Sequence, residues 1–384
     1  MSCLNTFLPH LVYYVCMRIA HVITTIDRGG AEQQLLTLVR EQLFLSETVK
    51  IFVLKGNNSL IREFRDLGAE VKMLGKNGNI ARQISQLRRE IKNYSPDVVH
   101  AHLPRAELIA RFSLMLMNNR LVITRHNVER FFPRNWFFSS SLLSRFVTRR
   151  ATTVIGISDA VLDFIKTQKE ISEKPTLARV YYGYDKNLST LLVSPNTSST
   201  RNASETLSIG TIARLVPQKD IATLLRAFCI VNSRFPNARL TIIGDGVQKL
   251  TLQNLADSLG VSKYISWIPN TNRRIELLSS LDVFVLTSKY EGFGLVLLEA
   301  MQAKVPIVAS RNSAISEVLG DSYFGLFATG APESCAELVI NMLNMSHSQR
   351  SELNRFYERN LERFDPAQMA KNIRDVYMRD KIIS

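Results

Sequence analysis

The sequence predicts an α/β protein with two domains, each built on a parallel sheet covered by helices. The chain has 384 residues, which is more than one typical hydrophobic core holds. Short apolar runs alternate with amphipathic helical segments in both halves, as in parallel α/β domains. A polar segment rich in Ser, Thr and Asn, 194–204, separates the halves and is typical of a linker. With 46% hydrophobic and 21% charged residues, the composition is that of a globular protein.

Each half contains a series of candidate strands. In the first half they are 18–25, 49–54, 70–74, 98–101, 121–124, 153–156 and 179–182. In the second half they are 207–212, 239–243, 264–267, 283–286 and 306–309. The final segment, 348–383, is polar and helical. We therefore expect an N-terminal domain at 17–195, a C-terminal domain at 205–345 and a helical segment at 346–384.

The positive charge is concentrated in the N-terminal half. The net charge is +14, and residues 1–200 hold 27 Lys and Arg against 16 Asp and Glu, whereas residues 201–384 hold 21 against 18. Arginines alternate with aromatic residues in one segment, 130–150, as they do in helices that lie on anionic lipid. The alternative is that these aromatic residues belong to the core and the arginines are solvated. The residues are Arg130, Phe131, Phe132, Arg134, Trp136, Phe137, Phe138, Arg145, Phe146, Arg149 and Arg150.

The cysteine pattern indicates a reducing compartment, and the hydropathy indicates neither a membrane span nor a signal peptide. The four cysteines are scattered and form no C-x-x-C pair. No apolar run is long enough to cross a bilayer. Residues 1–16 lack a basic n-region and make a poor signal peptide, so the first strand is expected directly after Met17.

Glu291 and Glu299 stand at the start of a helix that follows a buried strand. The run 281–288, Leu-Asp-Val-Phe-Val-Leu-Thr-Ser, has the apolar character of a parallel strand. Gly292 and Gly294 favour a tight turn into a helix, whose free N–H groups suit a phosphate. Since that phosphate would repel a carboxylate, Glu291 is expected to accept hydrogen bonds from sugar hydroxyls, and Glu299 from a ribose. The alternatives are a Glu291 that only caps the helix and a Glu299 on its surface.

The stretch from Glu291 to Glu299 resembles the E-x7-E signature of retaining, nucleotide-sugar-dependent glycosyltransferases with the GT-B fold, in particular family four (glycosyl transferases group 1). Three further segments resemble this family: the loop 29–32 (Gly-Gly-Ala-Glu), the strand and basic segment 209–219, and the strand end 242–246. The resemblance covers most of the chain. It implies two facing Rossmann-like domains with an interdomain cleft, and a final helical segment that crosses back to the N-terminal domain.

The resemblance also implies a set of site residues, because ligands of such sheets bind outside the carboxyl ends of the strands. The nucleotide sugar is expected on Gly29, Gly30, Gly292, Phe293, Gly294, Leu295 and Glu299. The catalytic group is expected to be Glu291, Lys219, Arg214 and His126. Arg214 and Lys219 would neutralise the departing diphosphate, although two basic residues near a loop are often only solvated.

His126 follows a strand in the sequence Thr-Arg-His-Asn. A family histidine at this kind of position contacts the donor sugar or supports the reaction centre, whereas a lone histidine is more often structural. Glu317 matches a Glu that is frequent in a helix of the family's C-terminal domain. The chain departs from the family at Asp220 and Lys304, where Gly is common, and Asp220 is expected to cap the following helix.

No metal is expected to hold the diphosphate, because the chain contains no Asp-x-Asp pair. His100 and His102 lie two residues apart at a strand end, but no third ligand for a metal is evident. These histidines are expected to line the acceptor side or to satisfy loop carbonyls. No cofactor is expected either, since the nucleoside diphosphate sugar is a substrate.

Together these features favour a retaining glycosyltransferase of hexosyltransferase type. It would move a sugar from a nucleoside diphosphate sugar to a lipid-linked or polysaccharide acceptor, as in lipopolysaccharide biosynthesis. The expected place is the cytoplasm, peripheral on the inner face of the cell membrane, with an anionic membrane surface as partner. A nucleotide-sugar epimerase of the same architecture and a basic nucleic-acid-binding protein are the alternatives. No nucleic acid is expected as a partner, since no such motif is present, and no G-x-G-x-x-G follows a strand as in a dehydrogenase.

Overall fold

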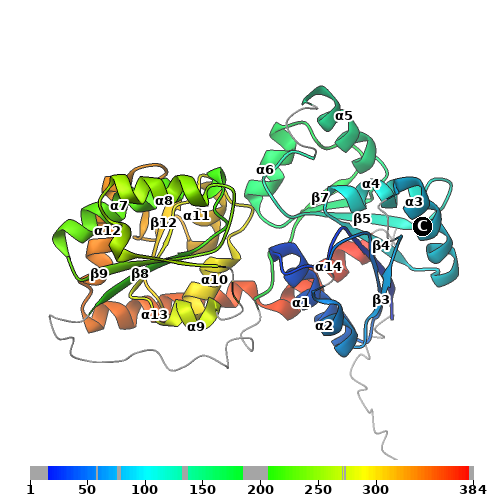
Figure 1. The fold of residues 1–384 in the computed structure, drawn as a ribbon. Helices are drawn as coiled ribbons and strands as arrows, with labels where there is room; N and C mark the ends of the chain where they lie inside the picture. The colour runs from blue at the N-terminus through cyan, green and yellow to red at the C-terminus, as the bar shows by residue number, and fades with distance from the viewer. Residues whose placement is uncertain are drawn as a thin grey trace, which may run out of the picture.

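The structure is a computed structural model that describes residues 16–57, 59–75, 79–131, 137–184, 206–269, 271 and 274–379. It contains two α/β domains, each with a parallel sheet and helices packed against it (Figure 1). The expected α/β architecture of two Rossmann-like domains is therefore confirmed. The predicted linker, 194–204, lies outside the described residues.

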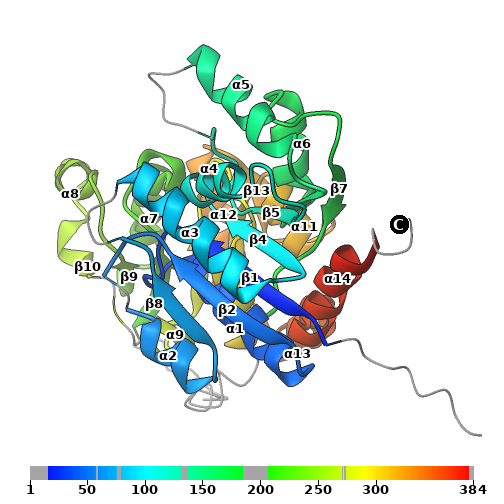
Figure 2. The ribbon, with the colours of Figure 1, turned by 90° about the vertical axis from the view of Figure 1, so that its right-hand side faces the viewer.

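The N-terminal sheet has seven parallel strands in the order β3-β2-β1-β4-β5-β6-β7 (Figure 2). The strands are β1 (Arg18–Ile23), β2 (Thr48–Val53), β3 (Glu70–Met73), β4 (Val98–His102), β5 (Arg120–Arg125), β6 (Thr153–Gly156) and β7 (Thr176–Arg179). The helices are α1 (Gly30–Phe44), α2 (Ile61–Asp66), α3 (Ile80–Tyr94), α4 (Pro104–Ser113), α5 (Phe137–Thr148) and α6 (Asp159–Thr167). The chain reverses its direction across the sheet between β1 and β4, where His21 pairs with His100. Such a reversal is a switch point, at which ligands of α/β sheets bind.

The C-terminal sheet has six parallel strands in the order β10-β9-β8-β11-β12-β13. The strands are β8 (Leu207–Ile212), β9 (Ala238–Ile243), β10 (Ile265–Ile268), β11 (Val283–Leu286), β12 (Ile307–Arg311) and β13 (Leu326–Ala328). The helices of this domain are α7 (Ile221–Arg234), α8 (Lys249–Ser258), α9 (Arg274–Ser279), α10 (Leu295–Gln302), α11 (Ser313–Leu319), α12 (Pro332–Leu343) and α13 (His347–Leu361), with short 3-10 turns η3 (Pro217–Lys219), η4 (Ser262–Tyr264) and η5 (Glu362–Phe364). The last helix, α14 (Pro366–Met378), belongs to the N-terminal domain. The switch point of this sheet lies between β8 and β11.

Apolar side chains cover both faces of the N-terminal sheet, which explains why its strands are continuous apolar runs. Successive residues of β1 show this arrangement. Ile19 packs with α1 and α14 on one face, and Ala20 packs with α3 and α4 on the other. The core of the C-terminal domain includes Leu353 and Tyr357 of α13.

Two described segments lie side by side at the boundary between the domains. One is the segment after β7, and the other is η5 between α13 and α14. Tyr184 N donates to Phe364 O at 2.7 Å, which joins the two segments. A Cβ on Gly183 would lie 2.6 Å from Pro366 Cα, so this close approach requires glycine. After η5, α14 packs on α1 in the N-terminal domain (Figure 1).

Two sheet edges differ from the sequence prediction. The strand expected at 179–182 is β7, Thr176–Arg179, whose residues are half-buried or exposed and therefore form no apolar run. The apolar residues that follow, Val180, Tyr182 and Tyr184, are buried outside the sheet. The short strand β13 was not predicted, because its three residues give too brief a pattern.

Candidate active site

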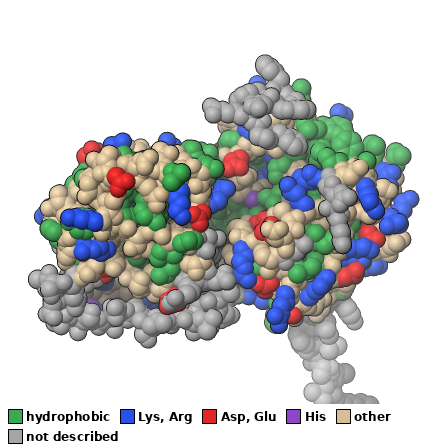
Figure 3. All heavy atoms as spheres, viewed as in Figure 1, with side chains coloured by type: hydrophobic (Ala, Val, Ile, Leu, Met, Phe, Trp, Pro, Cys, Tyr) green, Lys and Arg blue, Asp and Glu red, His purple; other side chains and the backbone are tan. Residues whose placement is uncertain are grey.

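Loops from the strand ends of both sheets meet between the domains, where the surface is hollowed (Figure 3). A Cβ on Gly292 would lie 2.7 Å from the carbonyl oxygen of His126 and 2.9 Å from Asn127 Cα. A Cβ on Gly30 would lie 3.4 Å from Leu295 Cδ1. The fold therefore brings the Gly29-Gly30 loop, the segment at His126 and the turn after Glu291 to one place.

Lys219 and Glu291 form an ion pair across the switch point of the C-terminal sheet. The distance from Lys219 Nζ to Glu291 Oε1 is 2.5 Å, and the side chains are 16% and 8% exposed. The Ser288 hydroxyl donates to the same oxygen at 2.6 Å. Thr287 Oγ1 donates to Lys219 O at 2.9 Å, so the loops after β8 and β11 also hold each other through the main chain. The pair is therefore charge-assisted and held in place before any ligand binds.

Arg214 projects from a tightly held turn just beyond β8. A Cβ on Gly244 would lie 2.0 Å from Ala213 O, and one on Gly246 would lie 2.3 Å from Leu215 O, so only glycine allows the two loops to pack this closely. The backbone on both sides of Arg214 is thus fixed, while its side chain is exposed. Among the residues that the structure describes, Arg214 takes part in no ion pair, so its charge is available to an anion.

The turn after Glu291 serves both as a helix start and as an interdomain contact. Gly294 has φ +91° and is the N-cap of α10, a conformation that favours glycine. The Phe293 ring is 2% exposed and packs at 5.2 Å from Tyr182 and 5.5 Å from Phe364. Phe293 therefore contributes its main chain to the site, and its side chain joins the domains. Glu299 lies one turn into α10 and is 9% exposed.

The His126 ring is bound by the protein through both of its nitrogens. Nδ1 lies 2.5 Å from the Tyr182 hydroxyl, and Nε2 lies 3.1 Å from His102 Nδ1. Burial, with a smaller contribution from Arg125, lowers the pKa of His126 to about 3, so the ring is neutral at pH 7. The structure thus places His126 beside the other predicted residues, with its main chain against Gly292.

His100 and His102 do not satisfy loop carbonyls, which was one of the two roles expected of them. They are 0% and 2% exposed and bond to side chains, with His100 between Tyr377 and Thr124. A third histidine, His21, joins them, and one ring nitrogen of each lies within 4.8 Å of the others. The expectation that no third metal ligand is nearby was therefore wrong. The signal that was missed is the pairing of β1 with β4, which places His21 opposite His100.

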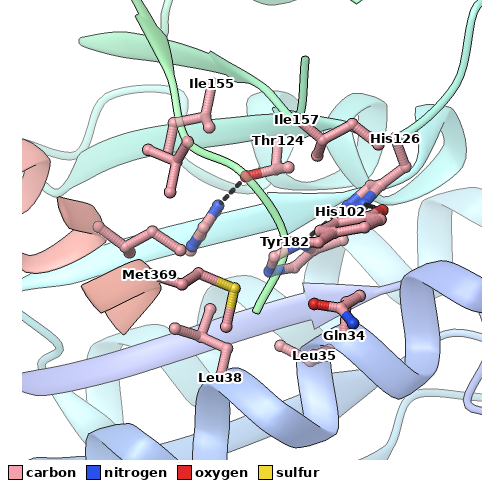
Figure 4. A pocket seen from close by; sticks show the side chains of 13 residues that line it. Gln34, Leu35, Leu38, His102, Thr124, His126, Ile155, Ile157, Tyr182 and Met369 are labelled. Carbon is pink, nitrogen blue, oxygen red and sulfur yellow. Dashed lines mark hydrogen bonds between the residues drawn. The ribbon is translucent and has the colours of Figure 1, made fainter. Parts of the chain in front are cut away.

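A small pocket adjoins these histidines (Figure 4). His102, His126 and Tyr182 lie next to one another on one side of it, and Leu38 and Met369 lie on another. The ring nitrogens of the three clustered histidines all have hydrogen-bond partners within the protein, so no ion is needed to satisfy them.

Glu317 has a role that sequence reasoning did not assign. Its carboxylate accepts from Asp159 N at 2.8 and 2.9 Å and therefore caps α6 of the opposite domain. Arg179 Nη1 lies 3.8 Å from the same carboxylate. Burial raises the pKa of Glu317 above its usual value. A carboxylate at a helix N-terminus is stabilised by the helix dipole, so Glu317 stabilises the domain contact.

The two positions where this chain lacks the family's glycine, Asp220 and Lys304, have backbone angles that glycine favours. Asp220 and Lys304 adopt positive φ angles, +46° and +56°, which glycine adopts without strain. The expectation that Asp220 caps α7 was wrong, because no backbone N–H donates to its side chain. Its carboxylate instead accepts from the Thr223 hydroxyl at 2.9 Å.

The basic and aromatic segment divides into core and surface residues. Phe131 is 3% exposed and packs over Arg125, and Arg150 donates to the carbonyls of Met117 and Asn119. The exposed apolar residues of α5 are Leu142 and Phe146, and Met115 and Leu116 lie beyond α4, a helix that packs on α5. Exposed Arg145 and Arg149 lie on and just after α5. Phe132, Arg134 and Trp136, and the side chains of Phe137 and Phe138, lie outside the described residues.

No helix in the described part of the chain combines the length and the apolar character of a membrane span.

Two family models match the chain. Glycosyltransferase Family 4 matches residues 28–183, and Glycosyl transferases group 1 matches residues 196–362. Together they cover most of the chain. The chain is therefore a glycosyltransferase of group 1 with the GT-B fold, and the expected family and enzyme class are confirmed.

Individual relatives are more distant. The alpha-monoglucosyldiacylglycerol synthase of Acholeplasma laidlawii is 33% identical over 130 residues, which are 33% of this chain and 33% of that protein. The D-inositol 3-phosphate glycosyltransferase of Corynebacterium urealyticum is 24% identical over 311 residues, 74% of this chain and 71% of that protein. The crystal structure of Anabaena HepE in complex with UDP-glucose has a TM-score of 0.79 at 19% identity, covering 94% of this chain and 99% of that chain.

Proposed function

We propose that this enzyme transfers a sugar, with retention of anomeric configuration, from a nucleoside diphosphate sugar to a lipid-linked or polysaccharide acceptor at the cytoplasmic face of the membrane. The observation that carries the proposal is the Lys219–Glu291 pair at the switch point of the C-terminal sheet, with exposed Arg214 on the same loop after β8 as Lys219. This arrangement supports a donor site in which the cations face the diphosphate and the carboxylate faces the sugar.

The proposed roles follow from charge. Arg214, Lys219 and the N-terminal end of α10 neutralise the diphosphate as it leaves, because negative charge grows there in the transition state. Glu291 accepts hydrogen bonds from sugar hydroxyls and orients the ring. Glu299 accepts from the ribose. With these residues neutralising the diphosphate, the reaction requires no metal ion. The complex of the structurally similar Anabaena HepE with UDP-glucose supports a donor of this class.

The acceptor side is proposed from the surface of the N-terminal domain. Leu142 and Phe146 are exposed apolar residues of α5, the helix that also carries Arg145, and exposed Leu116 follows α4, which packs on α5. Apolar residues with arginines suit an interface with anionic lipid. In Figures 1 and 2, α5 lies at the end of the N-terminal domain away from α1 and α2. The name of the Acholeplasma relative, a diacylglycerol glucoside synthase, supports a lipid acceptor.

The proposal is tested with a panel of nucleotide sugars. A true donor should raise the melting temperature of the protein and be slowly hydrolysed without acceptor. Once an acceptor is found, the coupling constant of the new anomeric proton shows whether configuration is retained. The Glu291→Gln variant serves as the control for enzyme-dependent turnover. Isomerised donor without transfer would instead identify an epimerase, and no stabilisation by any nucleotide sugar would contradict the proposal.

A further inference from the structure

A buried chain of hydrogen bonds runs from α1 through three histidines to the cleft. Gln42 Oε1 lies 2.9 Å from His21 Nε2, and His21 Nδ1 lies 3.0 Å from His102 Nε2. His102 Nδ1 lies 3.1 Å from His126 Nε2, and His126 Nδ1 lies 2.5 Å from the Tyr182 hydroxyl. The links come from α1, β1, β4 and the segment after β5, so the chain joins the domain core to the cleft.

The proton positions in this chain follow from its first member. A neutral imidazole has one N–H donor and one acceptor nitrogen, so the direction of one hydrogen bond dictates the next. With Gln42 Oε1 as acceptor, His21 and His102 each donate from Nε2. His126 then donates from Nε2 to His102, and the Tyr182 hydroxyl donates to His126 Nδ1. All three rings therefore carry their proton on Nε2.

Burial keeps the three rings neutral, as this arrangement requires. It lowers the pKa of His21 to about 4, and it holds the pKa of His102 well below its usual value. Burial also raises the pKa of Tyr182 well above its usual value, so its hydroxyl remains a donor.

We propose that Gln42, His21 and His102 are positioning residues that act through His126. They determine which nitrogen of His126 carries the proton, and they hold its ring in one orientation. Holding the His126 ring also fixes the main chain at His126 and Asn127, against which Gly292 packs. The effect on turnover rests on the proposed function, whereas the tautomer of His126 is a property of the protein without substrate.

His100 provides a matched control inside the same cluster. It lies on β4 two residues from His102 and is equally buried, and the centroids of the two rings are 4.1 Å apart with the rings tilted by 36°. Its own nitrogens bond to Tyr377 and Thr124. His100 therefore contacts the hydrogen-bonded residues but makes no hydrogen bond to any of them.

The experiment compares three variants of the full chain. His102→Leu breaks both links. His102→Asn places an amide oxygen near the position of Nδ1 and so keeps the acceptor for His126. His100→Leu removes the same volume outside the hydrogen-bonded chain. Selective ¹⁵N labelling of the six histidines gives the tautomer of each ring from its nitrogen shifts, and steady-state kinetics gives kcat and the donor KM.

We expect His126 to be protonated on Nε2 in the wild type, in His102→Asn and in His100→Leu. In His102→Leu the tautomer should change or become mixed, and kcat should fall roughly tenfold to a hundredfold with little change in KM, as expected for a misplaced group near the reacting centre. His102→Asn should recover most of the lost turnover. If His102→Leu does not fold, His102→Gln replaces it, because its amide reaches the Nε2 position and leaves the Nδ1 position empty.

Two results would overturn the inference. One is a wild-type tautomer in the variant that lacks the Nδ1 acceptor. The other is stoichiometric zinc binding that is lost in both His100→Leu and His102→Leu, which would assign the cluster to a metal site instead. Absence of sugar transfer with every donor would refute the proposed function alone, since the tautomer is measured without substrate.

Discussion

Lys219 and Glu291 are separated by 72 positions in the sequence, yet they form a 2.5 Å ion pair at the ends of two paired strands, β8 and β11. Both side chains are mostly buried. Removing one partner of such a pair leaves the other charge without compensation. The two residues are therefore expected to act as one unit.

Glu291→Gln and Lys219→Ala should each lower turnover by about a hundredfold or more, because each removes one preorganised electrostatic contact. The double variant should be about as slow as the slower single variant, since residues that act as a unit do not contribute additively. The measurement is kcat/KM for the donor, with thermal melting to verify folding. Wild-type rates, or losses that multiply in the double variant, would contradict this prediction.

Gly292→Ala should lower turnover at least tenfold by separating the domains. A Cβ at this position would lie 2.7 Å from His126 O and 2.9 Å from Asn127 Cα, which are main-chain atoms and cannot rotate away. Small-angle scattering should show a larger radius of gyration. Gly330→Ala is the control, because its φ of +77° disfavours alanine but no atom lies within 4 Å of the added Cβ, so it tests backbone strain without crowding. Unchanged scattering and turnover in Gly292→Ala would show that the contact is not needed.

Four buried histidines should make the protein less stable in mild acid. Burial lowers the pKa of His21 to about 4 and of His126 to about 3, and it holds those of His100 and His102 well below the usual value. Below about pH 6.5 the unfolded chain protonates these histidines while the folded protein does not. The unfolded state then binds more protons, so the free energy of unfolding falls as the pH falls.

Two buried glutamates act in the opposite direction. Burial outweighs nearby arginines and raises the pKa of Glu47 and of Glu107 to about 7. Between their unfolded and folded pKa values the folded state holds the extra proton, so this contribution loses stability as the pH rises. Glu317, whose pKa burial also raises, acts in the same direction, so four histidines against these glutamates leave at most about two protons, or about 2.7 kcal/mol per pH unit near pH 5.5.

Urea unfolding at several pH values between 5 and 6.5 measures this slope. Glu107→Gln should steepen it by about one proton, and His102→Leu should reduce it by about one. Stability that stays constant or increases as the pH falls would show that the histidines are protonated in the folded state.

EDTA should leave transfer activity largely intact. Arg214, Lys219 and the start of α10 are proposed to neutralise the diphosphate, and the chain has no Asp-x-Asp pair to hold a metal there. The measurement is the initial rate before and after chelation. Complete loss that magnesium or manganese restores would show that a metal carries the leaving group.

Reversing the charge of Arg145 and Arg149 should release the protein from anionic vesicles. Each basic residue near such a surface contributes on the order of 1 kcal/mol, so two reversals should weaken binding strongly at low salt. Sedimentation with vesicles that contain phosphatidylglycerol measures binding. Arg226→Glu with Arg234→Glu makes the same charge change at exposed positions of the C-terminal domain and should have no effect. Equal binding to neutral vesicles would exclude an electrostatic contact.

Most of the fold could be predicted because buried parallel strands are apolar along their whole length, as in β1 and β11. The strand at the edge, β7, lacks this signal, since its residues are only partly buried. The residues around Glu291 could be identified because they follow a strand and form a local turn. The structure shows that Glu291 is paired with Lys219.

Other residues at the site could not be predicted, because nothing in the sequence around them indicates their contacts. Glu317 bonds to backbone N–H groups of α6, and every residue except proline offers such a group. His21 lies 81 positions from His102, and only the pairing of β1 with β4 brings them together. Such contacts depend on topology, which spacing along the chain does not reveal.

The contact between the two segments at the domain boundary also limits how the enzyme can open. Tyr184, the last described residue before the linker, is hydrogen-bonded to Phe364 between α13 and α14, so the two domains are joined at this point. Rotation about an axis through this contact would keep the Tyr184–Phe364 hydrogen bond, and displacement grows with distance from the axis. Gly183 lies beside this contact, against Pro366. Residues that never touch a substrate can therefore govern the rate of product release.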